Sequence, residues 1–166
     1  ARMVSDGNAQ PWFDGINRPA FSPDGNRLVY CIKKGNDRQA VVEDGREIKT
    51  YDAIKGKPVF SPNSKHLAFL GVDDKKVSVV LDGKVILKDY KNAKEITFSP
   101  DSEHLAVAIA EDNKWHAAKD GKISEKGFDN VQELTFSPDS KRFVYAAESE
   151  KALFFVETGE KTDRYM

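Results

Sequence analysis

The sequence contains few of the residues that build covalent cross-links or membrane spans. Cys31 is the only cysteine among 166 residues, so no disulfide forms within the chain. No run of about 18 apolar residues occurs, and we expect no membrane insertion. Charge of one sign is also scarce, because 26 Lys and Arg side chains face 27 Asp and Glu side chains, a net charge of −1. Phosphate binding requires a clustered positive field, so this balance argues against nucleic acid as a partner.

The composition is that of a folded protein. Hydrophobic residues make up 39% and charged residues 32% of the chain, which is unlike a disordered segment. The length predicts a single domain over residues 1–166. The chain starts at Ala1 without a basic segment followed by an apolar one, so we expect a processed or excised chain whose compartment is left open.

A tandem repeat of about 38 residues runs through the chain. One landmark is Phe-Ser-Pro followed by Asp or Asn, as in FSPDGNRLVY and FSPNSKHLAF. Its copies start 39, 38 and 38 residues apart, at Phe21, Phe60, Phe98 and Phe136. A second landmark is the glycine of Asp-Gly or Thr-Gly, which recurs every 38 residues at Gly7, Gly45, Gly83, Gly121 and Gly159.

Each unit reads as four short strands. The Pro and Asp after the landmark Phe favour a tight turn, and an apolar stretch follows, such as 28–32 or 105–110. An Asp-Gly pair between two apolar stretches predicts a two-residue hairpin, because a type I′ turn needs positive φ at both positions. No segment shows a 3.6-residue apolar period, so we expect almost no helix.

Four antiparallel strands per unit predict an all-β fold, a β-propeller of four blades. A single blade has two apolar faces and must stack on its neighbours, so the landmark phenylalanines are expected between blades. Three closures stay open: a four-bladed ring, an eight-bladed ring of two chains, and a part of a longer array. Residues 1–16 repeat the last two strands of a unit, an extra half-blade. Either residues 8–14 or residues 160–165 are expected to complete the last blade.

The FSPDG and FSPDS segments, followed after two residues by Leu-Val-Tyr or a similar triplet, resemble the WD40-like propeller repeat of the TolB type. The resemblance covers nearly the whole chain and implies the propeller fold. It also implies a periplasmic or cell-surface location. TolB proper has six blades and a separate amino-terminal domain, so its lipoprotein-partner role is not carried over.

Residue types that carry chemistry occur only in positions that favour a structural role. The repeated serines always follow the landmark Phe, which predicts a turn role; they are Ser22, Ser61, Ser99 and Ser137. Cys31 lies in an apolar stretch. His66 and His104 occupy the repeat position of Arg27 and Arg142, which indicates an exposed basic site rather than a metal ligand. We therefore predict no catalytic residue, no metal and no cofactor.

Charged residues at the start of each unit are the remaining candidates. In a propeller, the connection from an outermost strand to the next innermost strand opens on one face, around the channel. Here it carries an Asp after the aromatic landmark and a charged residue three positions before the landmark Phe. Repeat symmetry predicts rings of charge at the channel mouth, positive in the first half and negative in the second. The candidate ligand-binding residues are Asp14, Arg18, Asp52, Lys57, Glu95, Asp129 and Glu133.

These observations favour a non-enzymatic binding or assembly module for a protein or peptide, and a homo-oligomer that closes a larger ring is a possible form of it. One alternative is a purely structural module within a longer propeller array. Another is a hydrolase or lyase with its site at the channel mouth. The enzyme is disfavoured because no unit breaks the repeat to install paired carboxylates or a nucleophile with its base.

Overall fold

The fold was analysed in a computed structural model, which describes the backbone of residues 2–5, 8–12, 15–35, 37–158 and 164–165. Side chains are described from residue 15 to residue 157, apart from Asn36. Eighteen strands are present: β1 (Arg2–Ser5), β2 (Asn8–Trp12), β3 (Gly15–Phe21), β4 (Leu28–Lys33), β5 (Gln39–Glu43), β6 (Arg46–Tyr51), β7 (Ala53–Phe60), β8 (Leu67–Asp73), β9 (Lys76–Leu81), β10 (Lys84–Tyr90), β11 (Asn92–Phe98), β12 (Leu105–Glu111), β13 (Lys114–Lys119), β14 (Lys122–Ile123), β15 (Asn130–Phe136), β16 (Phe143–Ser149), β17 (Ala152–Thr158) and β18 (Arg164–Tyr165).

Sixteen of the strands form four antiparallel sheets of four strands each, in chain order within each sheet. We call them blade 1 (β3–β6), blade 2 (β7–β10), blade 3 (β11–β14) and blade 4 (β15–β18). The described residues contain no helix, and accordingly none that is long and apolar enough to cross a membrane. The all-β prediction of four four-stranded blades is confirmed.

The Asp-Gly hairpins form as the sequence predicts. Asp82 and Gly83, between β9 and β10, have φ angles of 49° and 75°, and Asp120 and Gly121 have angles of 52° and 77°. Positive φ at both central residues is the geometry that matches the twist of the two flanking strands. The hairpin turns at Gly7 and Gly159 lie outside the described residues.

The serine after each landmark Phe organises the turn between the first two strands of a blade. The Ser22 Oγ accepts a hydrogen bond from the Arg27 backbone N–H at 3.0 Å and donates to the Asp24 carboxylate at 2.5 Å. Ser61, Ser99 and Ser137 repeat this pattern. The predicted turn role of these serines is confirmed, and their hydroxyl groups are occupied by it.

Apolar side chains from facing blades meet in three clusters. Between blades 2 and 3, for example, Leu70 and Val79 pack against Val107 and Ile109. Alternate residues of each middle strand face opposite neighbours, as the two-residue period of a strand requires. Blades 2 and 3 therefore each cover one apolar face of the blade before them and one of the blade after them.

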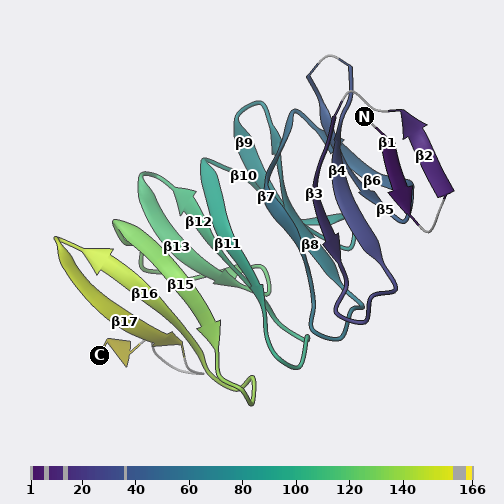
Figure 1. Cartoon of the computed structure of the whole chain (residues 1–166). Helices are drawn as coiled ribbons and strands as arrows, with labels where there is room; N and C mark the ends of the chain where they lie inside the picture. The colour runs from purple at the N-terminus through teal and green to yellow at the C-terminus, as the bar shows by residue number, and fades with distance from the viewer. Residues whose placement is uncertain (1, 6–7, 13–14, 36, 159–163, 166) are drawn as a thin grey trace.

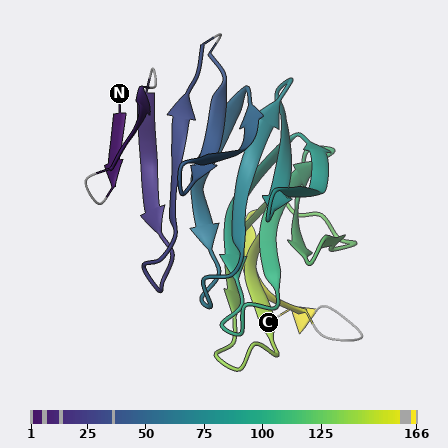
Figure 2. The same cartoon turned by 90° about the vertical axis from the view of Figure 1, so that its right-hand side faces the viewer.

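The four blades form an open row with the two termini at opposite ends (Figure 1). Figure 2 shows that most strands share nearly the same axis direction, alternately up and down, and that the N-terminal hairpin β1–β2 lies at the margin of the stack. In blade 4 the outermost position is taken by β18, which pairs with β17. Of the two segments expected to complete the last blade, the described part of the C-terminal one, Arg164–Tyr165, pairs with β17, and residues 8–12 lie at the other end of the row.

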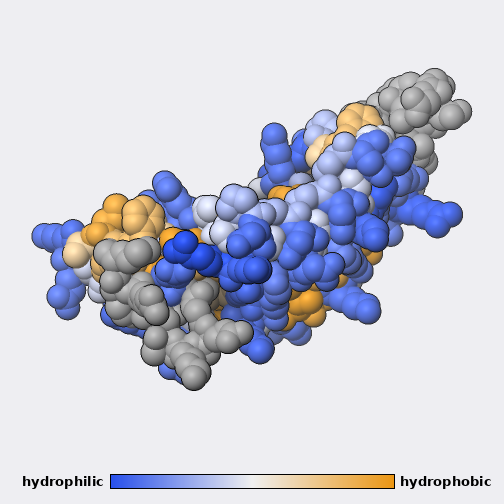
Figure 3. Space-filling model, turned by 90° about the horizontal axis from the view of Figure 1, so that it is seen from below, coloured by the Kyte–Doolittle hydropathy of each residue, from blue (hydrophilic) through white to orange (hydrophobic). Residues whose placement is uncertain are grey.

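The two ends of the row are covered to different extents. On the side of blade 1 that faces the hairpin, Tyr30, Ile32 and Val42 are at most 3% exposed. At the blade 4 end, Leu153 is 65% and Phe155 is 49% exposed, and an apolar patch is visible there (Figure 3). The landmark phenylalanines also differ, since Phe136 is buried but Phe21 is 65% exposed. The expectation that all four fill the space between blades is wrong for Phe21, because no earlier landmark turn lies against it.

Candidate functional site: the inner edge of the blades

The first strands of the four blades, β3, β7, β11 and β15, lie side by side along one edge of the row, which we call the inner edge (Figure 1). Each of these strands breaks its register with the second strand of its blade. The shifts fall between Asn17 and Ala20, Lys55 and Val59, Lys94 and Thr97, and Gln132 and Thr135. A bulge at the same repeat position therefore redirects one residue in each inner strand.

The bulges coincide with the charged candidates of the sequence. Arg18, Glu95 and Glu133 have φ angles of 55° to 56°. This is the left-handed region, which costs an ordinary residue about 1–2 kcal/mol. In blade 2 a glycine, Gly56, takes that conformation at φ 69° and Lys57 follows it. Strained backbone at charged, non-glycine residues is a feature that clusters at functional sites.

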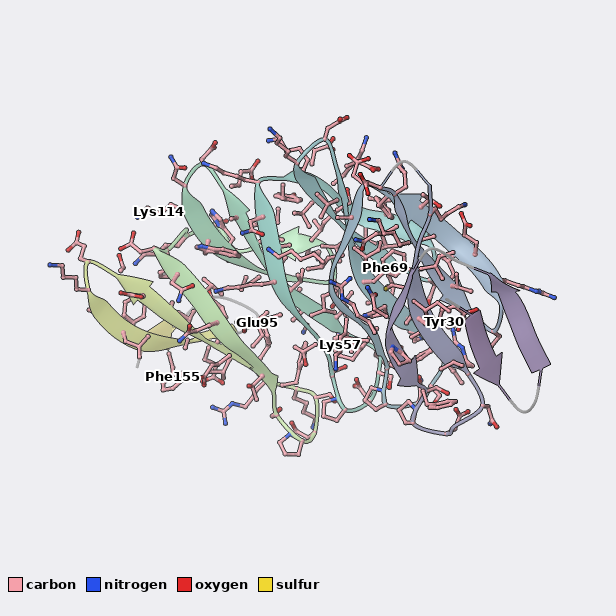
Figure 4. All side chains as sticks on the ribbon, turned by 45° about the horizontal axis from the view of Figure 1, so that its top comes forward. Tyr30, Lys57, Phe69, Glu95, Lys114 and Phe155 are labelled. Carbon is pink, nitrogen blue, oxygen red and sulfur yellow. The ribbon has the colours of Figure 1, made fainter. Side chains whose placement is uncertain are left out.

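Two of the bulge side chains reach across to the next blade. The Arg18 guanidinium donates to the Ile54 carbonyl at 2.9 Å, and the Glu95 carboxylate accepts from the Glu133 backbone N–H at 2.6 Å. Lys57, Glu95 and Glu133 are exposed, and Figure 4 labels Lys57 and Glu95 on the inner strands of adjacent blades. The inner edge thus carries basic groups on blades 1 and 2 and acidic groups on blades 3 and 4.

The predicted aspartates lie elsewhere. Asp52 and Asp129 directly precede β7 and β15, at the end of the inner strand opposite to the landmark Phe. The Asp52 carboxylate accepts from the Asp74 backbone N–H at 2.9 Å and pairs with Arg38 at 3.1 Å. Asp52 therefore stabilises the turn between β8 and β9 and is not grouped with the bulge charges. Asp14 lies outside the described residues.

Asp129 repeats this arrangement one blade later. Its carboxylate accepts from the Glu150 backbone N–H at 2.9 Å and pairs with Lys114 at 2.5 Å. These contacts, the Lys114 ammonium first, lower the pKa of the Asp129 carboxyl. The seven candidates thus do not form one ring: four lie on the bulges, and Asp52 and Asp129 serve as caps of turns.

A contact that the sequence analysis missed joins the blades on the side of the landmark turns. The ring of His66 stacks on that of Phe98 at a centroid distance of 6.5 Å, and the ring of His104 stacks on that of Phe136 at 6.2 Å. The Arg27 guanidinium takes the equivalent place over Phe60, 4.9 Å from the ring centroid. Each of these basic residues also pairs with an acid on its own blade. A cavity of about 330 Å³ opens between blades 2 and 3 beside His66, Leu81, Ile86, Phe98, His104 and Leu105.

The sequence does contain a signal for these pairs. Arg27 pairs with Glu43 at 2.6 Å and Arg142 with Glu157 at 2.5 Å, whereas both histidines pair with aspartates at 2.7 Å. Units with Arg at this position therefore pair it with Glu, and units with His pair it with Asp. In every unit the acid follows the basic residue by 15 or 16 positions. A comparison of the units with one another exposes this pairing.

Groups suited to catalysis or metal binding are sparse in the described part of the chain. Cys31 is 1% exposed, and burial raises the pKa of its thiol, which leaves it unreactive. No group of three or more His, Cys, Asp or Glu side chains with metal-binding geometry occurs among the described residues. The inner edge, with its charges and bulges, is the candidate functional site.

No protein-family model matches the sequence. Several solved structures are similar in fold. TolB from Acinetobacter baumannii aligns with a TM-score of 0.54 at 15% identity, covering 92% of this chain and 43% of that chain. The β-propeller domain of the Trilobed protease from Pyrococcus furiosus, which has an open velcro topology, aligns with a TM-score of 0.60 at 14% identity, covering 93% of this chain and 58% of that chain.

An oligogalacturonate lyase in complex with manganese aligns with a TM-score of 0.56 at 15% identity, covering 91% of this chain and 53% of the lyase. This chain spans about half the length of the three structures. A single fold serves proteins of different function, so these similarities establish architecture only. The chain has the fold of a TolB-like β-propeller.

Proposed function

We propose that the inner edge is a binding surface for a protein or peptide and that the chain performs no catalysis of its own. The observation that carries this proposal is the row of charged bulge residues. Three of them, Arg18, Glu95 and Glu133, hold left-handed φ angles in strands that would be less strained with glycine there. Glu95 and Glu133 are exposed and Arg18 is half-buried. Backbone strain at the two exposed charges brings no packing gain, so a role in recognition accounts for it best.

The charge pattern also defines the partner. Basic groups on blades 1 and 2 and acidic groups on blades 3 and 4 suit a partner that presents both signs along an extended segment. Complementary charges of this kind mainly steer encounter and select the partner. The field is screened over about 8 Å at physiological salt, so binding through it weakens as salt is added.

The described serines, the cysteine and the histidines support a non-enzymatic role. The serines hold the landmark turns, and the two stacked histidines hold adjacent blades. Covalent catalysis requires a nucleophile hydrogen-bonded to a base that a third group orients. Among the described side chains, these serines, the cysteine and the histidines form no such set. The fold itself is compatible with hydrolase and lyase chains as well, so the proposal depends on the side chains and not on the architecture.

A purely structural module is the second candidate. It is favoured by the Arg18–Ile54 and Glu95–Glu133 contacts, because these side chains already join neighbouring blades. If joining blades is their whole function, the charges on the inner edge have no partner outside the chain. Lys57 then separates the two candidates, because it lies on the same edge and is exposed.

The test is a capture experiment with tagged protein in a lysate of the source organism. The wild type is compared with the double variant Lys57→Glu, Glu95→Lys, which reverses both charges and keeps the net charge. The control variant Lys65→Glu, Glu103→Lys makes the same change at exposed turn residues away from the inner edge. We expect a partner that the wild type and the control retain and the inner-edge variant loses. The same proteins retained by all three would support the structural module instead.

A further inference from the structure

Two lysines occupy equivalent positions on adjacent inner strands, and both reach toward the next blade. Lys55 in β7 donates to the Asn92 side-chain oxygen at the start of β11. Lys94 in β11 donates to the Asn130 side-chain oxygen at the start of β15, at 2.8 Å. The same arrangement therefore occurs twice along the inner edge, one blade apart.

Neither lysine has an acidic partner. Both side chains are half-buried, and the oxygens that they contact belong to neutral amides. Among the residues with described side chains, no ion pair involves Lys55 or Lys94. A partly buried cation without a counter-charge is unfavourable compared with one that has an anion beside it.

The two ammonium groups also act on each other. Burial, followed by the charge of Lys94, lowers the pKa of Lys55. The Lys94 ammonium in addition lies 4.4 Å above the ring of Trp115, which holds it in place without neutralising it. An ammonium group has three N–H donors, and the asparagine takes one of them, so donors remain for a ligand.

The nearest acid of the inner edge makes no ion pair with these lysines. Glu95 follows Lys94 directly, but its carboxylate is bound to the Glu133 backbone N–H. Arg18 and Lys57 add positive charge on the same edge, on blades 1 and 2. The positive groups of the inner edge are thus Arg18, Lys55 and Lys57 on blades 1 and 2 and Lys94 on blade 3, where Glu95 adds a negative charge.

We propose that Lys55 and Lys94 form an anion-binding site for the carboxylate groups of an acidic peptide. One carboxylate binds beside the Lys55–Asn92 contact and one beside the Lys94–Asn130 contact. The site rests on the proposed function, since it identifies the acidic part of the segment, carrying both signs, that the inner edge binds. A bound carboxylate would accept hydrogen bonds from the remaining N–H donors of the ammonium groups. Such charge-assisted hydrogen bonds are strong, and the negative charge would offset the repulsion between the two ammonium groups.

The test measures the affinity of the whole chain for acetyl-tetraglutamate amide by isothermal titration calorimetry at low salt, with inorganic phosphate and acetyl-tetraglutamine amide as separate probes. We expect the acidic peptide to bind and Lys55→Gln with Lys94→Gln to weaken binding at least tenfold. The matched control, Lys84→Gln with Lys88→Gln, removes two exposed lysines from β10 and should weaken it less than threefold. Fluorescence of Trp115 in a Trp12→Phe background should change on binding, because the ammonium above its ring is drawn to the ligand.

Equal weakening by the two double variants would overturn the site, as would binding of phosphate without binding of the acidic peptide. The melting temperature of the Lys55→Gln, Lys94→Gln variant should stay at or above that of the wild type, since a repulsion is removed, so loss of binding is not loss of fold. The capture experiment with the Lys57 and Glu95 reversal is independent of this result. A partner that depends on Lys57 and Glu95, together with no affinity for the acidic peptide, would refute the lysine site and leave the proposed function in place.

Discussion

On the faces of the blades the repeat places buried aromatic or aliphatic side chains, whereas on the inner edge the same repeat places charges that change sign. Tyr30, Phe69, Val107 and Tyr145 share one position in the second strand of their blades. All four are at most 2% exposed. The bulge position carries Arg18, Lys57, Glu95 and Glu133 in turn.

The difference shows which positions folding constrains. An apolar face between two blades must be filled without water, so a charged side chain there is excluded by its desolvation cost. A charge on the solvated inner edge contributes little to stability whatever its sign. Variation of sign along that edge is therefore free to serve recognition, and the labelled residues of Figure 4 illustrate the two environments, with Tyr30 and Phe69 within the blades and Lys57 and Glu95 on the edge.

The largest expected effect is the loss of stability when a buried phenylalanine is replaced, compared with the replacement of an exposed one. Phe69 is fully buried and Phe21 is 65% exposed. Phe69→Ala should lower the free energy of unfolding by about 3–5 kcal/mol, because it removes a large ring and leaves a cavity. Phe21→Ala is the matched control and should change it by less than about 1 kcal/mol. Denaturant titrations of the two variants measure both values, and equal losses would contradict the assigned faces.

A smaller effect is expected where an aromatic ring passes over a glycine. A Cβ atom added at Gly71 in β8 would lie 2.4 Å from the ring of Tyr51, which is part of the contact between blades 1 and 2. Gly71→Ala should therefore destabilise the protein by about 1–3 kcal/mol, as overpacking does.

Gly35→Ala is the control for this glycine, since nothing lies within 4 Å of the added atom and its φ is not in the left-handed region. Thermal unfolding of the two variants gives the comparison. A loss at Gly35 that equals the loss at Gly71 would show that the cause is the backbone and not the Tyr51 ring.

The smallest effect concerns the landmark turns and appears only in acid. The Ser22 hydroxyl and then the Asn26 backbone N–H lower the pKa of Asp24 from 3.8 to about 2. The pKa values of Asp101 and Asp139 are lowered by the equivalent serines. A carboxyl whose pKa is lower in the folded state stabilises that state above its unfolded pKa. This stabilisation is lost as the pH falls from about 4 toward 2.

Blade 2 supplies the natural control for these turns. Asn63 stands at the position of Asp24 and accepts the same two hydrogen bonds without a charge. Replacement of Asp24, Asp101 and Asp139 by Asn should therefore flatten the fall of stability between pH 4 and pH 2. Urea titrations at pH 7, 4 and 2.5 test this, and an unchanged acid slope in the triple variant would assign the loss to other carboxylates.

Local chemistry made several elements predictable. Asp82-Gly83 and its repeats are hairpins because only residues that tolerate positive φ fit a two-residue turn. The Ser-Pro-Asp turns form because the hydroxyl and carboxyl groups bond to backbone atoms a few residues away. The position of Arg18, Lys57, Glu95 and Glu133 on one edge also follows from the period, since equivalent residues of stacked blades lie side by side.

Contacts between units were not predictable in the same way. Nothing in the neighbourhood of His66 indicates that its ring stacks on Phe98, because the two residues belong to different blades and are 32 positions apart. The separation of Asp52 and Asp129 from the bulge charges has a different origin. Each aspartate bonds to the turn between the second and third strands of the blade that it precedes, and the antiparallel pairing of the first two strands of that blade brings the turn to it.

The sequence by itself determined the all-β architecture, the number of blades, the turns and the residues that lie on the inner edge, because these depend on interactions within one 38-residue unit and on its repetition. The tertiary structure decided which landmark phenylalanine is exposed, which charges are used between blades, and that no acid among the described side chains pairs with Lys55 or Lys94. These depend on the faces of neighbouring blades, whose side chains meet across long sequence separations. A repeat therefore specifies its own fold locally, and the differences between its copies acquire meaning only when the copies are stacked.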